Sequence, residues 1–155
     1  MKQLLLWGVL CSAPFLLKSQ VHLAPSVEFV GSYEDGGWAG FGLGIRIGQM
    51  EVLPAFLLGE GKGGKLEMRW YQKFTEIQVF RPFFSVQQVV FRSINTCVNN
   101  SCPFVFYQFL PGVGSVLRIW KGCQLFGSVN VGLKKSEQRP LSSDFNVGLG
   151  VRYEF

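Results

Sequence analysis

Beyond its N-terminal region the chain has no long uninterrupted apolar run. Hydrophobic residues make up 48% of its 155 residues, but charged or polar residues break every later run before the ~18 residues that a membrane-spanning helix needs. Helical membrane spans are therefore not expected. The aromatic content of 15% excludes a disordered chain, and the length suits one compact domain.

Histidine is nearly absent, and the basic residues are not clustered. The single histidine, His22, falls in the expected N-terminal tail, which makes it a poor base for the serine chemistry of lipid-modifying barrel enzymes. We therefore expect no enzyme, no catalytic residue and no cofactor. Lys and Arg residues are scattered singly along the chain, so the basic stripe of a nucleic-acid binder is missing and a nucleic-acid partner is excluded.

The N-terminal segment has the layout of a signal peptide. Lys2 precedes an apolar run over residues 4–17, and Ser19 follows that run. This order matches the basic start, the apolar centre and the small residue at the cleavage site of exported proteins. We predict that residues 1–19 are a signal peptide and that residues 20–155 form the mature domain.

From Ser26 onward, apolar residues recur at every second position, which is the period of a β-strand. In the clearest segment, residues 38–48, the face opposite the apolar one consists of glycines and Arg46. A soluble β-sandwich would carry Lys, Glu, Thr and Ser on its outer face instead. Glycines that face the lumen of a small barrel leave room for large neighbouring side chains and permit tight curvature. The apolar positions of this segment are Ala39, Phe41, Leu43, Ile45 and Ile47.

The C-terminal segment has the strongest pattern, because it alternates up to its last residue, which is aromatic. In a membrane its polar positions would face the barrel interior and its apolar positions would face lipid, with Tyr153 and Phe155 at the interface. A soluble domain has no reason to end in this way. The apolar set is Phe145, Val147, Leu149, Val151, Tyr153 and Phe155, and the polar set is Asn146, Gly148, Gly150, Arg152 and Glu154.

This last segment, which finishes in Tyr-x-Phe, resembles the terminal strand of bacterial outer-membrane barrels. The remainder resembles the small eight-stranded barrels of the OmpA/OmpX type. The resemblance implies that Tyr153 and Phe155 form an assembly signal for the barrel-assembly machinery and that the protein is exported to the bacterial outer membrane, where it contacts lipid. It also implies a non-enzymatic structural or surface-interaction role, in which the outer loops would meet an extracellular ligand.

We therefore predict an all-β fold, an eight-stranded antiparallel up-and-down transmembrane β-barrel. With both ends in the periplasm, the outer loops are expected near residues 33–37, 59–64, 93–103 and 133–144, and the inner turns near residues 49, 74–81 and 121. The expected strands lie near residues 26–34, 38–48, 51–59, 65–73, 82–92, 104–118, 123–134 and 145–155.

Two of these regions leave alternatives open. Pro54 removes a ladder donor, which suggests a bulge or a strand end near residues 51–58. Residues 74–92 alternate on both faces, so the strand boundary there is uncertain by several residues. The residues that would face lipid in this region are either Phe84, Val86 and Val90, or Phe83, Val89 and Phe91.

Three short motifs carry little chemistry. Residues 59–65 match the first seven positions of a phosphate-binding loop, but Leu66 replaces the hydroxyl residue and a strand pattern follows, so we predict a hairpin tip.

Cys97 and Cys102 lie in an expected outer loop, where we predict a local disulfide that shapes the loop, with two free thiols as the alternative. Without a nearby histidine this pair is a poor zinc site, and we expect no metal. A lipoprotein anchor at Cys11 would need a small residue before it, where Leu10 stands.

A set of charged side chains is expected to face the lumen. The interior of an eight-stranded barrel is just wide enough for side chains to fill, so we expect these charges to pair with one another and to plug the barrel. A narrow pore or transport path through them is the alternative function. A lipid-modifying barrel enzyme and a soluble lipid-binding barrel are further alternatives, the latter disfavoured by the glycine-rich face. The charged set is Glu28, Arg46, Glu67, Arg69, Arg118, Lys134, Arg152 and Glu154.

Overall fold

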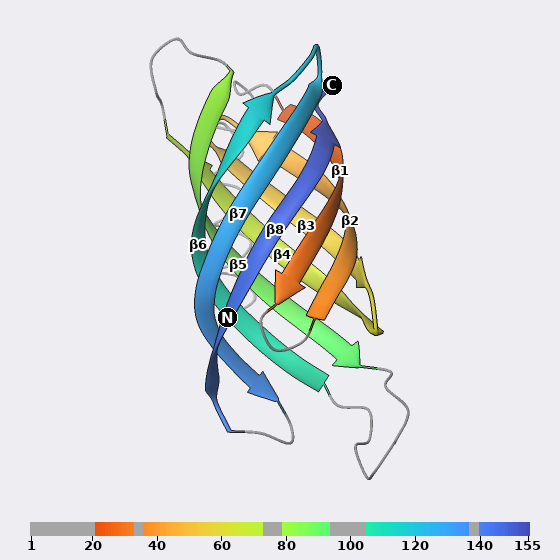
Figure 1. The fold of residues 1–155 in the computed structure, drawn as a ribbon. Coiled ribbons are helices and arrows are strands. Elements are labelled where there is room, and N and C mark those ends of the chain that lie inside the picture. The colour runs from red at the N-terminus through yellow and green to blue at the C-terminus, as the bar shows by residue number, and fades with distance from the viewer. Residues whose placement is uncertain (1–20, 33–35, 73–78, 94–104, 137–139) are drawn as a thin grey trace, which may run out of the picture.

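The computed structural model describes residues 21–32, 36–72, 79–93, 105–136 and 140–155. These residues form eight β-strands, each antiparallel to its neighbours, and β8 pairs with β1 to close a barrel. Figure 1 shows the strands following one another around the barrel in chain order, which confirms the predicted eight-stranded up-and-down architecture. The strands are β1 (Val21–Ser32), β2 (Gly36–Ile47), β3 (Met50–Leu58), β4 (Gly61–Tyr71), β5 (Phe80–Ser93), β6 (Val105–Arg118), β7 (Cys123–Ser136) and β8 (Ser142–Tyr153).

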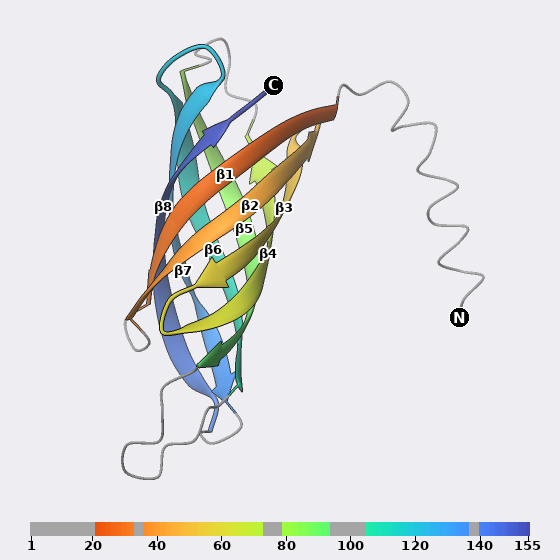
Figure 2. The same ribbon diagram turned by 90° about the vertical axis from the view of Figure 1, so that its right-hand side faces the viewer.

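The barrel has two distinct ends. We call the end where β1 begins and β8 finishes the terminal end, and the opposite one the loop end. The up-and-down path places the short β2–β3 and β6–β7 turns at the terminal end. Gly48 in the first of these turns has a φ of 62°, which residues with a β-carbon rarely adopt. In Figure 2, which is turned by 90°, the strands cross obliquely to the long axis of the barrel.

Successive residues of each strand point alternately out of the barrel and into it. The outward positions are apolar and exposed, as in Phe29, Phe41, Trp70 and Leu149. The inward positions include most of the buried polar and charged side chains. This arrangement is the reverse of a soluble barrel, whose apolar side chains would line the interior. Among the described residues, no helix is long and apolar enough to cross a membrane.

The first strand begins earlier than predicted, at Val21 and not near residue 26. Pro25 is tolerated because its side of β1 toward β8 is still unpaired, so the missing N–H breaks no ladder there. Pro25 pairs with Leu43 of β2, and the ladder between β1 and β8 starts only at Ser26. The expectation that His22 lies in a tail was therefore wrong. His22 belongs to β1, where its Cα pairs with that of Arg46.

The interruption predicted at Pro54 is neither a bulge nor a strand end. β3 runs continuously past Pro54, and its ladder with β4 is complete there. The ladder between β2 and β3 keeps the same register on both sides of Pro54 but lacks the pairs that would join residues 43–44 to residues 53–54. The missing N–H is therefore accommodated by a local gap in one ladder.

The structure also shows which residues of the region 74–92 point outward. β5 spans Phe80–Ser93, and Phe84, Val86 and Val90 point outward, whereas Phe83, Val89 and Phe91 are buried inside. Two predicted outer loops were too long: β4 starts at Gly61, and residues 137–141 alone separate β7 from β8.

Candidate functional site

The centre of the lumen holds a buried carboxylate between two cations of the same strand. Lys65, Glu67 and Arg69 are spaced by two along β4, so all three point inward. Lys65 Nζ donates a hydrogen bond of 3.0 Å to Glu67, and Arg69 donates bonds of 2.7 Å from Nε and 3.0 Å from Nη2. The guanidinium of Arg69 also lies between the rings of Phe83 and Phe126, at 4.7 and 4.5 Å from their centroids.

A second carboxylate, Glu51 of β3, joins this group to the last strand. Arg152 Nη1 of β8 donates hydrogen bonds of 2.6 and 2.7 Å to the two oxygens of Glu51. The hydroxyl of Tyr71 donates to the same carboxylate. Arg69 Nη1 lies 3.7 Å from Glu51 Oε2, so the two carboxylates share one connected set of charges.

Lys65 extends the set to β1, since its Nζ lies 2.5 Å from Glu28 Oε1, an ion pair without the geometry of a hydrogen bond. We call these six side chains the central network. Its three carboxylates and three cations balance one another, as buried charges must when no water compensates them. The central network consists of Glu28, Glu51, Lys65, Glu67, Arg69 and Arg152.

The structure distributes the predicted lumen charges over three levels. Glu28, Glu67, Arg69 and Arg152 lie in the central network. Arg46, Arg118 and Glu154 lie at the terminal end, and Lys134 lies in the loop half. Sequence reasoning missed Glu51 and Lys65, although both occupy positions that the alternation of β3 and β4 directs inward.

Glycines of β2 make room for the buried carboxylates. Gly40 pairs with Glu28, and a β-carbon on Gly40 would lie 2.7 Å from Cγ of that glutamate. A β-carbon on Gly44 would collide with the carboxylate of Glu51. The glycine-rich face of this strand is therefore the space in which side chains of neighbouring strands lie.

Aromatic rings fill the loop half of the lumen. Trp38 of β2 lies 5.1 Å from Phe91 of β5 and 5.9 Å from Phe106 of β6, and the two phenylalanine rings are 5.4 Å apart between centroids. We call these three rings the aromatic plug. Because they come from strands on different sides of the barrel, they cross the lumen. Lys134 Nζ lies 4.8 Å from the centroid of Phe106, so it belongs to this level and not to the central network.

The terminal end of the lumen is organised around one carboxylate, Glu154. Arg46 and Gln124 donate hydrogen bonds to it, and His22 Nδ1 lies 3.5 Å from its Oε1. Burial opposes ionisation of Glu154. The bond from Gln124 and the charges of Arg46 and Arg152 outweigh that effect and hold the pKa of Glu154 below its ordinary value of 4.5.

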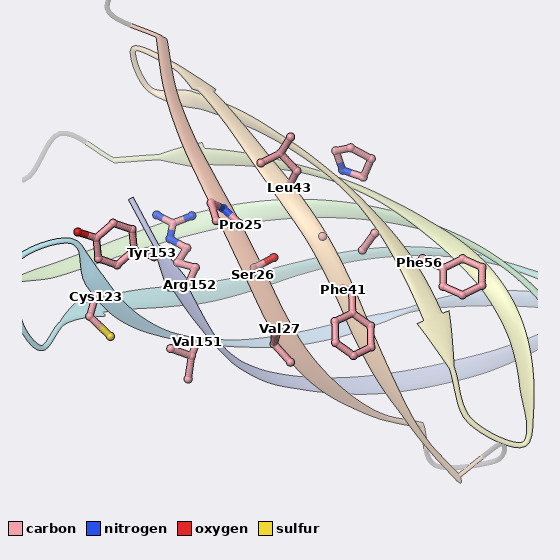
Figure 3. A pocket seen from close by; sticks show the side chains of 13 residues that line it. Pro25, Ser26, Val27, Phe41, Leu43, Phe56, Cys123, Val151, Arg152 and Tyr153 are labelled. Carbon is pink, nitrogen blue, oxygen red and sulfur yellow. The ribbon is translucent and has the colours of Figure 1, made fainter. Parts of the chain in front are cut away.

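The outer face carries a shallow apolar groove of about 800 Å³ across β8, β1, β2 and β3. Its floor is the backbone at the paired residues Arg152, Ser26, Gly42 and Ala55, which occupy inward positions of their strands. Figure 3 shows this groove and the side chains that border it. One wall consists of Val151, Val27, Phe41 and Phe56, and the other includes Tyr153, Pro25, Leu43 and Pro54.

The predicted assembly signal lies on the outer face of the barrel. Tyr153 and Phe155 point outward with ring centroids 5.0 Å apart, and the amide of Phe155 bonds to the carbonyl of Leu23. Cys97 and Cys102 lie outside the described residues, so their disulfide stays a prediction. Within the described part of the chain, no group of three or more His, Cys, Asp or Glu could hold a metal ion.

Comparison with known proteins gives likenesses of fold alone. No family model and no curated protein sequence matches the chain. The N-terminal β-barrel domain of Pseudomonas aeruginosa OprF is similar, with a TM-score of 0.64 and 14% identity over 89% of this chain and 100% of that one. Outer membrane protein H (OprH) of P. aeruginosa has a TM-score of 0.55 and 9% identity, over 88% of this chain and 100% of that one. Neisserial surface protein A (NspA) has a TM-score of 0.54 and 11% identity, over 87% of this chain and 97% of that one.

These observations define a class of protein. A closed antiparallel barrel with an apolar outer face and a polar, filled interior is the architecture that buries every backbone hydrogen bond while it faces lipid. A designed transmembrane β-barrel also superimposes on the chain, with a TM-score of 0.60. The protein thus has the fold of the small eight-stranded outer-membrane barrels, and the predicted fold class is confirmed.

Proposed function

We propose that the protein is a non-enzymatic barrel of the bacterial outer membrane with a structural or surface-interaction role. A signal peptide at residues 1–19 directs its export, and the barrel-assembly machinery inserts residues 20–155. The terminal end then faces the periplasm, and the connections at the loop end face the outside, where they meet an extracellular ligand. The likeness to outer membrane protein H and to a surface protein of Neisseria supports this placement.

The observation that carries the proposal is the filled lumen. The aromatic plug crosses the loop half, and the central network pairs its charges between the plug and the terminal end. A barrel of eight strands has no spare width for a water-filled channel once such side chains occupy it. Transport through the lumen is therefore disfavoured, and the surfaces of the barrel remain as the parts available for function.

The contacts of the single histidine also favour a non-enzymatic role. Within the described residues, the charged or polar side chain that His22 contacts is Glu154, and no serine or cysteine side chain is paired with its imidazole. Acyl transfer by a barrel enzyme needs a nucleophile within hydrogen-bond reach of its base. The groove on the outer face gives the outer-membrane lipid an apolar surface in which acyl chains fit.

The test is fractionation of bacteria that express the full-length chain, followed by electrophoresis of unheated and boiled samples. We expect the chain, shortened by its signal peptide, in the outer-membrane fraction, with different mobilities before and after boiling. Recovery as a soluble periplasmic protein would contradict the proposal, because the apolar outer face could then not be in lipid. Planar-bilayer recordings provide the second arm: a resolved, reproducible conductance would overturn the sealed lumen in favour of a narrow pore.

A further inference from the structure

The lumen at the terminal end contains more positive than negative charge. Arg81 of β5 and Arg118 of β6 reach the same space as Arg46 and Glu154. Arg81 Nη1 lies 4.0 Å from Glu154 Oε2, and Arg118 pairs with Gln124, whose side chain donates a hydrogen bond to Glu154. We call Arg46, Arg81, Arg118 and Glu154 the terminal vestibule. Its three guanidinium groups and one carboxylate leave a net charge of +2.

Within the part of the chain that the structure describes, neighbouring acidic side chains do not neutralise this positive excess. The central network below the vestibule is balanced within itself. Lys121 in the β6–β7 turn belongs to the same end and adds a further positive charge.

The positive groups are also partly withdrawn from water. The side chain of Arg46 is 12% exposed, and that of Arg81 is 26% exposed. Among the described residues, the buried Nε of Arg118 has no hydrogen-bond partner. Like charges held together at reduced exposure repel one another more strongly than on an open surface. A buried donor without an acceptor costs further free energy. An anion between Arg81 and Arg118 would relieve both effects.

We propose that the terminal vestibule binds a phosphate group, held between the guanidinium forks of Arg81 and Arg118 with Arg46 nearby. Guanidinium groups bind phosphate through paired N–H donors, which suits a cluster of arginines better than one of lysines. The three arginines occupy inward positions of their strands and not lipid-facing ones, so a soluble phosphate or phosphate ester is the favoured source. The proposal does not depend on the role proposed above.

The test is a titration of the refolded barrel in octyl glucoside, a detergent without phosphate. Inorganic phosphate replaces chloride at constant ionic strength, and the Nε–H resonances of the arginines are followed by nuclear magnetic resonance. We expect saturable shifts for Arg81 and Arg118. Each of Arg81→Gln and Arg118→Gln should weaken binding roughly tenfold, because each removes charge-assisted hydrogen bonds.

Two further variants control for indirect effects. Glu154→Gln removes the competing carboxylate and should tighten phosphate binding severalfold, a gain that a poorly folded variant could not produce. Lys62→Gln removes an exposed cation of β4 near the loop end and should leave the affinity unchanged. Shifts that do not saturate, or equal affinity in the Arg81→Gln/Arg118→Gln double variant, would overturn the proposal.

A last arm identifies the source of the phosphate group. The barrel is placed in phosphatidylglycerol nanodiscs without added phosphate. Arginine resonances at the positions of the free protein support a soluble ligand, whereas resonances already at the bound positions support a lipid headgroup as the ligand.

Discussion

At the scale of single residues, the lumen is held together by charges that would be costly if any one of them were unpaired. Glu67 is completely buried, and its carboxylate accepts hydrogen bonds from Lys65 and Arg69. A buried pair adds little net stability compared with apolar residues of the same shape, but removal of one partner leaves a buried charge uncompensated. The central network should therefore be sensitive to every single substitution that changes its charge.

We expect Glu67→Gln to lower the free energy of unfolding by about 3–5 kcal/mol, because it leaves Lys65 and Arg69 with one carboxylate fewer in a buried site. Urea unfolding in detergent, followed by tryptophan fluorescence, measures the change. Lys62→Gln, which alters an exposed charge of the same strand, should change the stability by less than about 1 kcal/mol. Equal effects of the two variants would show that the central network does not stabilise the barrel.

The glycines of β2 are expected to be sensitive for a steric reason. Gly40→Ala places a β-carbon 2.7 Å from Cγ of Glu28, and overpacking of this kind costs about 1–3 kcal/mol. Gly31→Ala is the matched control, because Gly31 faces outward and its nearest neighbour to a new β-carbon is 3.9 Å away. Urea midpoints should fall for Gly40→Ala and stay the same or rise for Gly31→Ala. A lower midpoint for both would indicate a general intolerance of glycine replacement in this part of the barrel, and not a steric clash with Glu28.

Glu154 should make the stability depend on pH. Because its pKa is lower in the folded barrel than its ordinary value of 4.5, the ionised carboxylate stabilises the fold above that pH. The contribution is lost as the pH falls through the folded-state pKa. We expect the unfolding free energy of the unmodified barrel to decrease more steeply below pH 4.5 than that of Glu154→Gln, as followed by urea unfolding at a series of pH values. Parallel pH profiles would contradict this role.

At the scale of the strands, alternation predicted the inward face where only one face was apolar, as in residues 38–48 and 145–155, but left it open for residues 74–92. It did not predict which side chains meet. Glu51 and Lys65 stand at the first residues of the expected strands 51–59 and 65–73, where ends and turns obscure the pattern. Their partners Arg152 and Glu28 come from β8 and β1. Such contacts depend on the registers of several ladders, and a register changes with the length of each turn.

Prolines illustrate the same limit. Pro54 and Pro111 each lie within a continuous strand, and beside each one a single ladder lacks two pairs while its register is kept. The sequence shows only that a donor is missing. Which neighbouring strand faces the missing donor follows from the hydrogen-bonding phase of the barrel, so the prediction of a bulge or strand end at Pro54 was wrong.

The aromatic plug tests how far strands on different sides of the barrel depend on one another. Trp38→Ala removes the ring that β2 packs against β5 and β6, and we expect a loss of about 3–5 kcal/mol in unfolding free energy. Trp120→Ala is the control, because Trp120 is 79% exposed in the β6–β7 turn. A resolved conductance in planar bilayers for Trp38→Ala, but not for the unmodified chain, would identify the plug as the seal of the lumen. No loss of stability would contradict its packing role.

At the scale of the whole molecule, closure joins the two ends of the chain. β8 pairs with β1 from Ser26 to Ser32, and the backbone of Phe155 extends this contact by a hydrogen bond to Leu23. The ring of Phe155 contributes little to the folded barrel, because the residue is 77% exposed and points outward. We therefore expect this ring to serve assembly more than stability.

We expect Phe155→Ala to separate these two roles. Refolding into detergent and the urea midpoint should be unchanged, since the backbone bond to Leu23 does not need the ring. The amount of barrel recovered from the outer-membrane fraction of cells should fall severalfold, because the assembly machinery would no longer find an aromatic residue at the end of β8. Phe29→Ala removes an equally outward ring from the middle of β1 and should leave that amount unchanged. If Phe155→Ala lowers the urea midpoint instead and leaves membrane recovery intact, the terminal aromatic acts on stability and the assembly signal lies elsewhere.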